Sequence, residues 1–302
     1  MRHQDVTLHR SDPDMPLRTG AQFVVLSRGV RVETEQWDAL DRLEQRRLRV
    51  TARYQTLRSR PAVSHGSAAA MWGLPSFDRD DGRLHVVDST RARTHSGPGV
   101  VRHAAVVHRR EVEYFDGVFV TNALRTVVDV IRSSSFTHAV LVLDHALRAG
   151  LVTVDSVRAA LADASSSRGT VRAAHALDFA DGASESPGES WSRVRIRELR
   201  LPPPELQREF VTPSGRFRVD FWWPAVGVVG EFDGRVKYRS GDPEALWHEK
   251  QREDALRRLP TMRNVARWTM SDLAVPARLA AILHGAGVMR TPKHRPSDET
   301  PP

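Results

Sequence analysis

Two short apolar segments of this sequence carry acidic residues of the kind that bind a divalent metal ion. Residues 218–223 read RVDFWW and contain Asp220, and residues 228–234 read VVGEFDG and contain Glu231 and Asp233. Because a carboxylate inside an apolar run needs a partner, the pattern predicts adjacent strands that present acids at a common edge. Oxygen ligands suit a hard cation that activates water and neutralises charge on a phosphate. We therefore expect Asp220 and Glu231 to bind Mg²⁺ (or Mn²⁺).

Two further residues extend this candidate site. Asp233 shares a strand face with Glu231, because side chains alternate along a strand. Lys237 follows after a turn at Gly234, and a lysine near such acids can stabilise the transition state or position the attacking water. Each residue also has an ordinary interpretation. Asp220 could be an exposed acid at a strand end, Asp233-Gly234 a simple turn, and Lys237 a surface lysine.

The elements that must position these residues are predicted from residue 184 onward. A helix begins at Ser186-Pro187-Gly188-Glu189 and ends before the prolines at 202–204. Strands are expected at 205–211, 217–223, 226–232 and 264–268, and helices at about 243–259 and 276–284. The order is therefore helix, three strands, helix and strand, followed by a closing helix.

This order resembles the restriction-endonuclease-like PD-(D/E)xK superfamily over roughly residues 184–285, and more closely its DUF559 and very-short-patch-repair-like relatives. Glu-Phe-Asp-Gly followed by Lys-Tyr is familiar there, and residues 231–234 and 237–238 match it. The superfamily usually has Lys two residues after the glutamate, where this chain has Asp233, so the resemblance assigns that role to Lys237. It also implies a third acid, Glu189, which could equally close a capping box with Ser186.

The helix expected after the site carries interleaved charge. These charges could pair with one another along the helix. They could instead contact a nucleic-acid backbone through four basic residues, Lys250, Arg252, Arg257 and Arg258.

The N-terminal part resembles another family. Residues 64–75 (SHGSAAAMWGLP), 116–121 (DGVFVT) and 125–129 (RTVVD) are similar to the AbiEi-family antitoxin-type region. Such proteins commonly begin with a winged helix-turn-helix, of which residues 21–60 would be a remnant. Ser27 to Val30 resembles the wing, whereas residues 1–20 offer no counterpart of the recognition helix.

Local patterns place the elements of this part. A hairpin is expected at 23–32 with Gly29 at its turn, and one arginine-rich helix at 35–57. Ser64 should cap a helix from His65 to Trp72, and further strands should precede a hairpin at Asp116-Gly117. Helices capped by Thr121 and Thr153 should follow, together with helices at 136–149 and 171–180. We expect the histidines of this half (His65, His85, His95, His103, His108, His138, His145 and His175) to be structural or exposed.

Composition sets the partner and the compartment. The formal charge is +8, from 45 Lys+Arg against 37 Asp+Glu, which suits a polyanionic partner. The chain has no cysteine, which removes disulfides and thiolate sites. It has neither a signal-peptide core nor a run long enough to span a membrane. We expect a cytoplasmic protein that binds nucleic acid, DNA in preference to RNA, without a membrane partner; the sequence leaves its oligomeric state open.

These patterns predict an α/β (α+β overall) protein, with a helical N-terminal and middle region that has a small β portion, followed by a restriction-endonuclease-like α-β-β-β-α-β domain. The expected boundaries are a disordered leader at 1–20, the winged-helix remnant at 21–60, an AbiEi-like domain at 61–182, the nuclease-like domain at 183–286 and a disordered tail at 287–302. The predicted function is metal-dependent phosphodiester hydrolysis, as in a DNA endonuclease of defence or repair type. The alternative is an antitoxin-type, nucleic-acid-binding transcriptional regulator whose nuclease-like domain is inactive.

Overall fold

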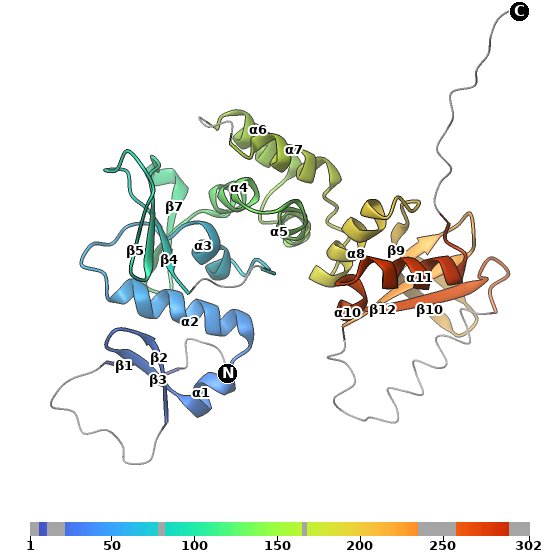
Figure 1. Ribbon diagram of the computed structural model, residues 1–302, viewed down its shortest axis with the longest axis horizontal. Coiled ribbons are helices and arrows are strands. Elements are labelled where there is room, and N and C mark those ends of the chain that lie inside the picture. The colour runs from blue at the N-terminus through green and yellow to red at the C-terminus, as the bar shows by residue number, and fades with distance from the viewer. Residues whose placement is uncertain (1–5, 11–21, 78–81, 165–167, 235–257, 290–302) are drawn as a thin grey trace, which may run out of the picture. The chain divides into compact units, whose positions relative to one another are not determined.

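The computed structural model describes residues 6–10, 22–77, 82–164, 168–234 and 258–289 (Figure 1). Contacts divide the chain into two compact units, Met1–Gly182 and Ala183–Pro302. Helices and small sheets alternate through both units, so the fold is of the mixed α/β class. None of the described helices is long and apolar enough to cross a lipid bilayer.

A three-stranded sheet opens the first unit. Its order is β1 (His9–Arg10), β3 (Val30–Glu33) and β2 (Phe23–Ser27), and all neighbours are antiparallel. Gly29 has a φ of 75°, which confirms the expected hairpin turn. The expectation of disorder across 1–20 is wrong for residues 6–10, because Val6 is buried and β1 pairs with β3. A two-residue strand is too short to leave a periodic signal in the sequence.

The single helix expected at 35–57 is two helices, α1 (Thr34–Asp38) and α2 (Arg42–Gln55). Asp41 starts the second helix, since its side chain accepts a hydrogen bond from the Glu44 amide at 2.8 Å. The Glu44 carboxylate accepts one from the Asp41 amide at 3.0 Å. This capping box satisfies amides at a new helix start. The helical spacing of the apolar residues continues across the break and concealed it.

Short strands surround the next helix, α3 (His65–Met71). One sheet has the order β4 (Leu84–Val87), β6 (Val100–His103) and β5 (His95–Gly97), with β4 and β6 parallel. A 3-10 helix, η2 (Arg109–Glu111), leads into the hairpin of β7 (Val112–Phe115) and β8 (Val118–Thr121). That hairpin turns through positive φ at Asp116 and Gly117, as expected. Ser64 makes no side-chain capping bond, so its predicted role as a cap is wrong.

Four helices complete the first unit: α4 (Ala123–Ser133), α5 (Phe136–Arg148), α6 (Val154–Ala162) and α7 (Thr170–Phe179). They pack on one another, with α5 between α4 and α7 in the contacts (Figure 1). Asn122 caps α4, where Thr121 was expected; the Thr121 hydroxyl is buried against Thr126 instead. Thr153 caps α6 as predicted.

The second unit is a four-stranded sheet with helices on one face. Helix α8 (Pro187–Glu198) precedes β9 (Glu205–Thr212), β10 (Gly215–Trp223) and β11 (Val228–Asp233). β12 (Asn264–Thr269), α10 (Met270–Leu273) and α11 (Pro276–Ala286) follow. The sheet order is β12-β11-β10-β9, and only β11 and β12 are parallel.

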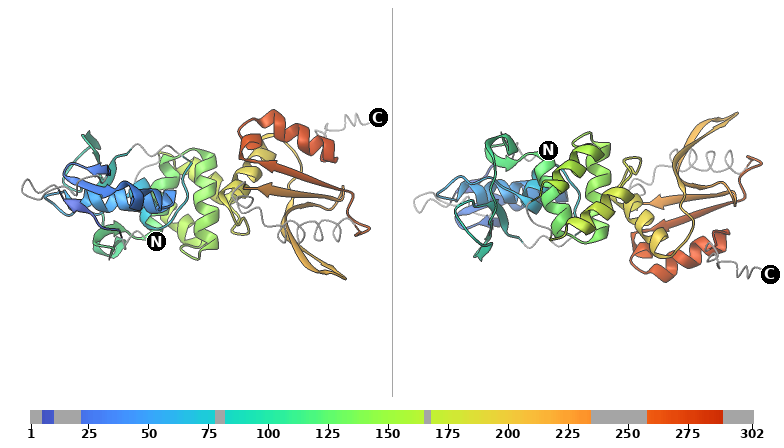
Figure 2. Two further views of the ribbon diagram at one scale, coloured as in Figure 1. Left: turned by 90° about the horizontal axis from the view of Figure 1, so that it is seen from below. Right: turned by 90° about the horizontal axis from the view of Figure 1, so that it is seen from above.

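Large aromatic and aliphatic side chains fill the space between this sheet and its helices. Figure 2 shows α11 along one face of the sheet. Its core contains buried residues of α8, β10, β12 and α11: Ile196, Phe221, Trp223, Trp268, Leu279 and Leu283. Most of the helix expected over about 243–259 lies outside the described residues.

Candidate functional site

Asp220 lies where the sheet of the second unit is interrupted. The ladder to β9 pairs the residues on either side of Asp220, yet Asp220 and the facing Gln207 are not paired. Gln207 has a φ of 51°, in the left-handed region that a glutamine rarely adopts. On the other side, the ladder to β11 stops at Phe221, which pairs with Gly230. The Asp220 carboxylate is therefore free of regular sheet pairing on both flanks.

The Asp220 side chain replaces the missing backbone partner on the β11 side. Its Oδ2 accepts a hydrogen bond from the Phe232 amide at 2.9 Å. The register, continued by one residue, places Glu231 opposite Asp220. Glu231 and Asp233 are both half-buried, and Glu231 lies beside Arg267 of β12 in the parallel register. The two sequence-predicted acidic segments thus meet at one place in the sheet.

Glu189 joins this site from helix α8. Its side chain is only 6% exposed, and its Oε2 accepts hydrogen bonds from the Glu185 amide at 2.9 Å and from Gln207 Nε2 at 2.8 Å. Ser186 caps the helix through the Glu189 amide. Glu189 therefore bonds backbone just before the helix and also contacts β9, so both interpretations of this residue have a structural counterpart.

Electrostatics connect Glu189 to Asp220. Burial raises the pKa of Glu189, and the negative charge of Asp220 raises it further. The hydrogen bonds from Glu185, Ser186 and Gln207 act in the opposite direction but do not cancel the effect. Two carboxylates that disfavour each other's ionisation are a feature of functional sites as well as of some structural ones.

Close packing holds α8 against the strand that carries Glu231. A Cβ placed on Gly188 would lie 2.0 Å from Cε1 of Phe232, so only glycine allows this approach. The Trp268 indole donates to Ser192 Oγ at 2.7 Å, and that hydroxyl donates to the Gly188 carbonyl at 2.7 Å. The position of Glu189 relative to Asp220 is thus set by buried contacts on both sides of the helix start.

The acids fit a magnesium ion better than a metal that needs a full protein cage. Among the described residues, no group of three or more His, Cys, Asp or Glu is placed to hold a metal ion. Mg²⁺ is usually bound through one or two carboxylates, with water completing its shell. Glu189 and Asp220 provide such a pair, and a cation would offset the charge repulsion between them.

Several predicted residues cannot be placed in this site. Arg258 is exposed in the segment before β12. Lys237, Lys250, Arg252 and Arg257 lie outside the described residues, and their predicted roles remain predictions.

Sequence reasoning missed two features. Gln207 reads as an ordinary residue of an alternating strand, and a glutamine gives no signal for a left-handed backbone. The second feature is in the first unit, where His65, His85 and His103 come together although the sequence separates them widely. No spacing rule could have found that cluster, because its members come from a helix and two strands.

Comparison with known proteins gives relatives but no activity. The chain is 32% identical over 230 residues to the uncharacterized protein Rv2248 of Mycobacterium tuberculosis (strain ATCC 25618 / H37Rv), a match that covers 72% of this chain and 77% of the relative. The uncharacterized protein MT2308 of Mycobacterium tuberculosis (strain CDC 1551 / Oshkosh) matches with the same identity and coverage. No protein-family model matches the chain, and no solved structure matches it significantly.

Proposed function

This chain belongs to the family of the uncharacterized Mycobacterium tuberculosis proteins Rv2248 and MT2308, and we propose that its second unit is a metal-dependent nuclease that hydrolyses nucleic-acid phosphodiesters. DNA is the proposed substrate, in a defence or repair role. One observation carries the proposal: Asp220 is unpaired by both neighbouring strands and lies close enough to buried Glu189 to raise its pKa. The resemblance of residues 184–285 to the PD-(D/E)xK superfamily and its DUF559 relatives supports it.

Asp220 and Glu189 would hold the ion, with Glu231 opposite Asp220. Mg²⁺ or Mn²⁺ would supply a water of lowered pKa and neutralise charge on the phosphate. The chain's own contacts orient these acids: the Phe232 amide holds one oxygen of Asp220, and Gln207 holds one oxygen of Glu189. Asp233 would complete or orient the site at the end of β11. Lys237, by resemblance, would support the attacking water or the phosphate.

A cleavage assay tests this proposal. Plasmid DNA is incubated with the wild-type chain, Asp220→Asn or Glu231→Gln, each with Mg²⁺ or Mn²⁺. We expect each variant to lose about 100-fold or more of the rate, the order found when one stabilising group is removed from a preorganised site. Glu205→Gln is the matched control, because Glu205 is an exposed acid at the start of β9. Equal rates in all four proteins, or no cleavage by the wild type with either metal, would overturn the proposal.

A second candidate function is a DNA-binding regulator of antitoxin type, in which the nuclease-like unit has no catalytic activity. The observation in its favour is that no group of three metal-ligating side chains occurs within the described part of the chain. The resemblance of residues 64–75 to the AbiEi-type region points the same way. Tight DNA binding by a wild-type chain that never cleaves would select this function.

A further inference from the structure

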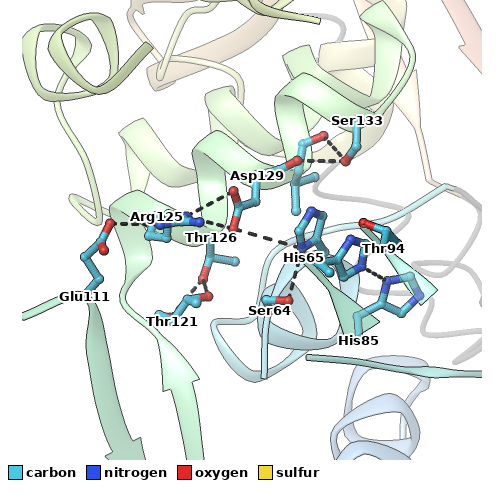
Figure 3. Close-up of polar contacts among 12 residues, drawn as sticks. Ser64, His65, His85, Thr94, Glu111, Thr121, Arg125, Thr126, Asp129 and Ser133 are labelled. Carbon is cyan, nitrogen blue, oxygen red and sulfur yellow. Dashed lines mark hydrogen bonds and ion pairs between the residues drawn. The ribbon is translucent and has the colours of Figure 1, made fainter. Parts of the chain in front are cut away.

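Three histidines of the first unit form a packed cluster. His65 lies at the start of α3, His85 on β4 and His103 on β6. The His85 Nδ1 and His103 Nε2 atoms are 2.9 Å apart, within hydrogen-bonding distance. The His65 and His103 rings stack with centroids 3.6 Å apart and planes 11° from parallel. Figure 3 shows His65 and His85 close together, with His65 also near Asp129 of α4.

This cluster forms one wall of a pocket of about 320 Å³. Arg46, Arg49 and Arg53 of α2 also line the pocket, together with Arg83 before β4. No aspartate or glutamate is among the described residues that line it. A cavity with arginines and histidines in its wall and no acid has a positive potential, which favours an anionic ligand.

The arginines are held in ways that keep their charge available. Arg53 donates to the carbonyl oxygens of Leu26 at 3.3 Å and Gly99 at 3.1 Å. Arg46 donates to the Gly66 carbonyl at 3.3 Å. Carbonyl oxygens orient a guanidinium group without neutralising it, and guanidinium groups match the geometry of phosphate oxygens.

Ser134 is a second, independent sign of a missing ligand. It lines the pocket, is 9% exposed, and its buried Oγ has no hydrogen-bond partner among the described residues. A buried hydroxyl without a partner is costly. The residue lies just before α5, a helix of 13 residues whose N-terminal end adds positive potential. An acceptor oxygen of a bound anion would satisfy this hydroxyl.

The same histidines do not suit a metal ion. The hydrogen bond between His85 and His103 and the face-to-face stacking of His65 turn their nitrogen lone pairs away from a common point. The absence of any metal-ligating trio in the described residues agrees with this geometry. Burial lowers the pKa of His65 well below its usual value, and burial also lowers that of His103 to about 4. Both imidazoles are therefore neutral at pH 7.

We propose that this pocket binds the phosphate group of a small phosphorylated molecule of mononucleotide size. Its volume lies at the lower end of the range for small-molecule sites, which suits one phosphate and a small organic group. The arginines would neutralise the phosphate, Ser134 would donate to one of its oxygens, and the stacked imidazoles would form the floor. The site lies within the first unit, so it is independent of the proposed nuclease site.

Calorimetric titration of the full chain without added metal tests the site, using inorganic phosphate, AMP and adenosine as probes. We expect AMP to bind at millimolar concentration or below, phosphate more weakly and adenosine not at all. Arg46→Gln and Ser134→Ala should each weaken AMP binding about 10-fold or more, the difference made by one charge-assisted contact or one buried partner. Ser134→Ala should not lower thermal stability, because it removes an unsatisfied hydroxyl.

Arg148→Gln is the matched control for charge, because Arg148 is exposed on α5 and does not line the pocket. Unchanged AMP binding in Arg46→Gln and Ser134→Ala would overturn the proposal, as would equal binding of AMP and adenosine or no binding of any probe. A 5′-phosphorylated oligonucleotide is the last arm. If it bound while AMP and phosphate did not, the small-molecule assignment would be wrong.

Discussion

Buried polar side chains define both candidate sites at the scale of single residues. Glu189 is surrounded by donors from Glu185 and Gln207, yet burial and Asp220 keep its pKa raised. Ser134 has a buried hydroxyl with no described partner. Such groups lower the stability of the chain by itself, and each would be stabilised by a ligand of opposite character: a cation at Glu189 and an anion at Ser134.

Glu189→Gln should raise stability at neutral pH. The folded state raises the pKa of Glu189, so its favourable contribution is present below the unfolded value and is lost as pH rises through the folded value. Glutamine keeps an acceptor oxygen and carries no charge. We therefore expect the variant to exceed the wild type in free energy of unfolding at pH 7 to 8, and the difference to disappear near pH 4.

Urea unfolding across that pH range measures this difference, with Glu205→Gln as the exposed control. Addition of Mg²⁺ at pH 7.5 should raise the stability of the wild type more than that of Glu189→Gln. A gain that stayed constant down to pH 4 would mean that the Glu189 charge is not its source.

Close approaches of helix and strand position the acids at the scale of elements. Helix α8 meets β11 where Gly188 contacts Phe232, and Phe232 is also the residue whose amide holds Asp220. The buried hydrogen bonds of Ser192 fix the same end of the helix against β12. The geometry of the acidic site thus depends on one glycine that touches no ligand.

Gly188→Ala should disturb this contact. The added methyl would meet Phe232 at 2.0 Å, and overpacking of this kind costs about 1–3 kcal/mol. Because Phe232 must move, the hydrogen bond to Asp220 should weaken, and cleavage should slow more than stability alone explains. Thermal unfolding and the cleavage rate of the folded protein measure the two effects.

Gly285→Ala is the matched control, since it is also a glycine-to-alanine change in a helix and its added Cβ meets nothing within 4 Å. It should leave cleavage unchanged and raise stability by up to about 1 kcal/mol through helix propensity. If both variants behaved alike, the contact between Gly188 and Phe232 would have no role in the site.

Charge is the property that belongs to the whole molecule. An excess of eight positive charges, with 45 Lys+Arg and 37 Asp+Glu, favours association with a polyanion of any sequence. That attraction is separate from catalysis, since a protein can bind DNA through its charge and lack a competent metal site. The two properties therefore need separate measurements.

Asp220→Asn should bind duplex DNA at least as tightly as the wild type while failing to cleave it, because the change removes one negative charge from a site that faces phosphate. The logarithm of the binding constant should fall linearly with the logarithm of salt concentration for both proteins, as counterions are released. Fluorescence anisotropy at several salt concentrations measures this slope. Binding that did not respond to salt would argue against a backbone-contacting mode.

Local signals in the sequence determined much of the fold. The apolar runs around Asp220 and Glu231 became β10 and β11, and Ser186 caps α8. The hairpin turn at Asp116-Gly117 formed as the dipeptide predicts. These features depend on residues near one another in the chain, so periodicity and capping rules detect them. The roles of Lys237, Lys250, Arg252 and Arg257 lie outside the described residues and stay predictions.

Only the tertiary structure decided how the polar groups meet. The left-handed turn at Gln207 and its bond to Glu189 join β9 to α8, and the stacking of His65 on His103 joins α3 to β6. None of these pairs has a characteristic spacing, because each depends on the packing of whole elements and on the burial that packing creates. The sequence by itself placed Asp220 and Glu231 at the edge of adjacent strands. The fold added Glu189 as a buried, charge-coupled partner of Asp220.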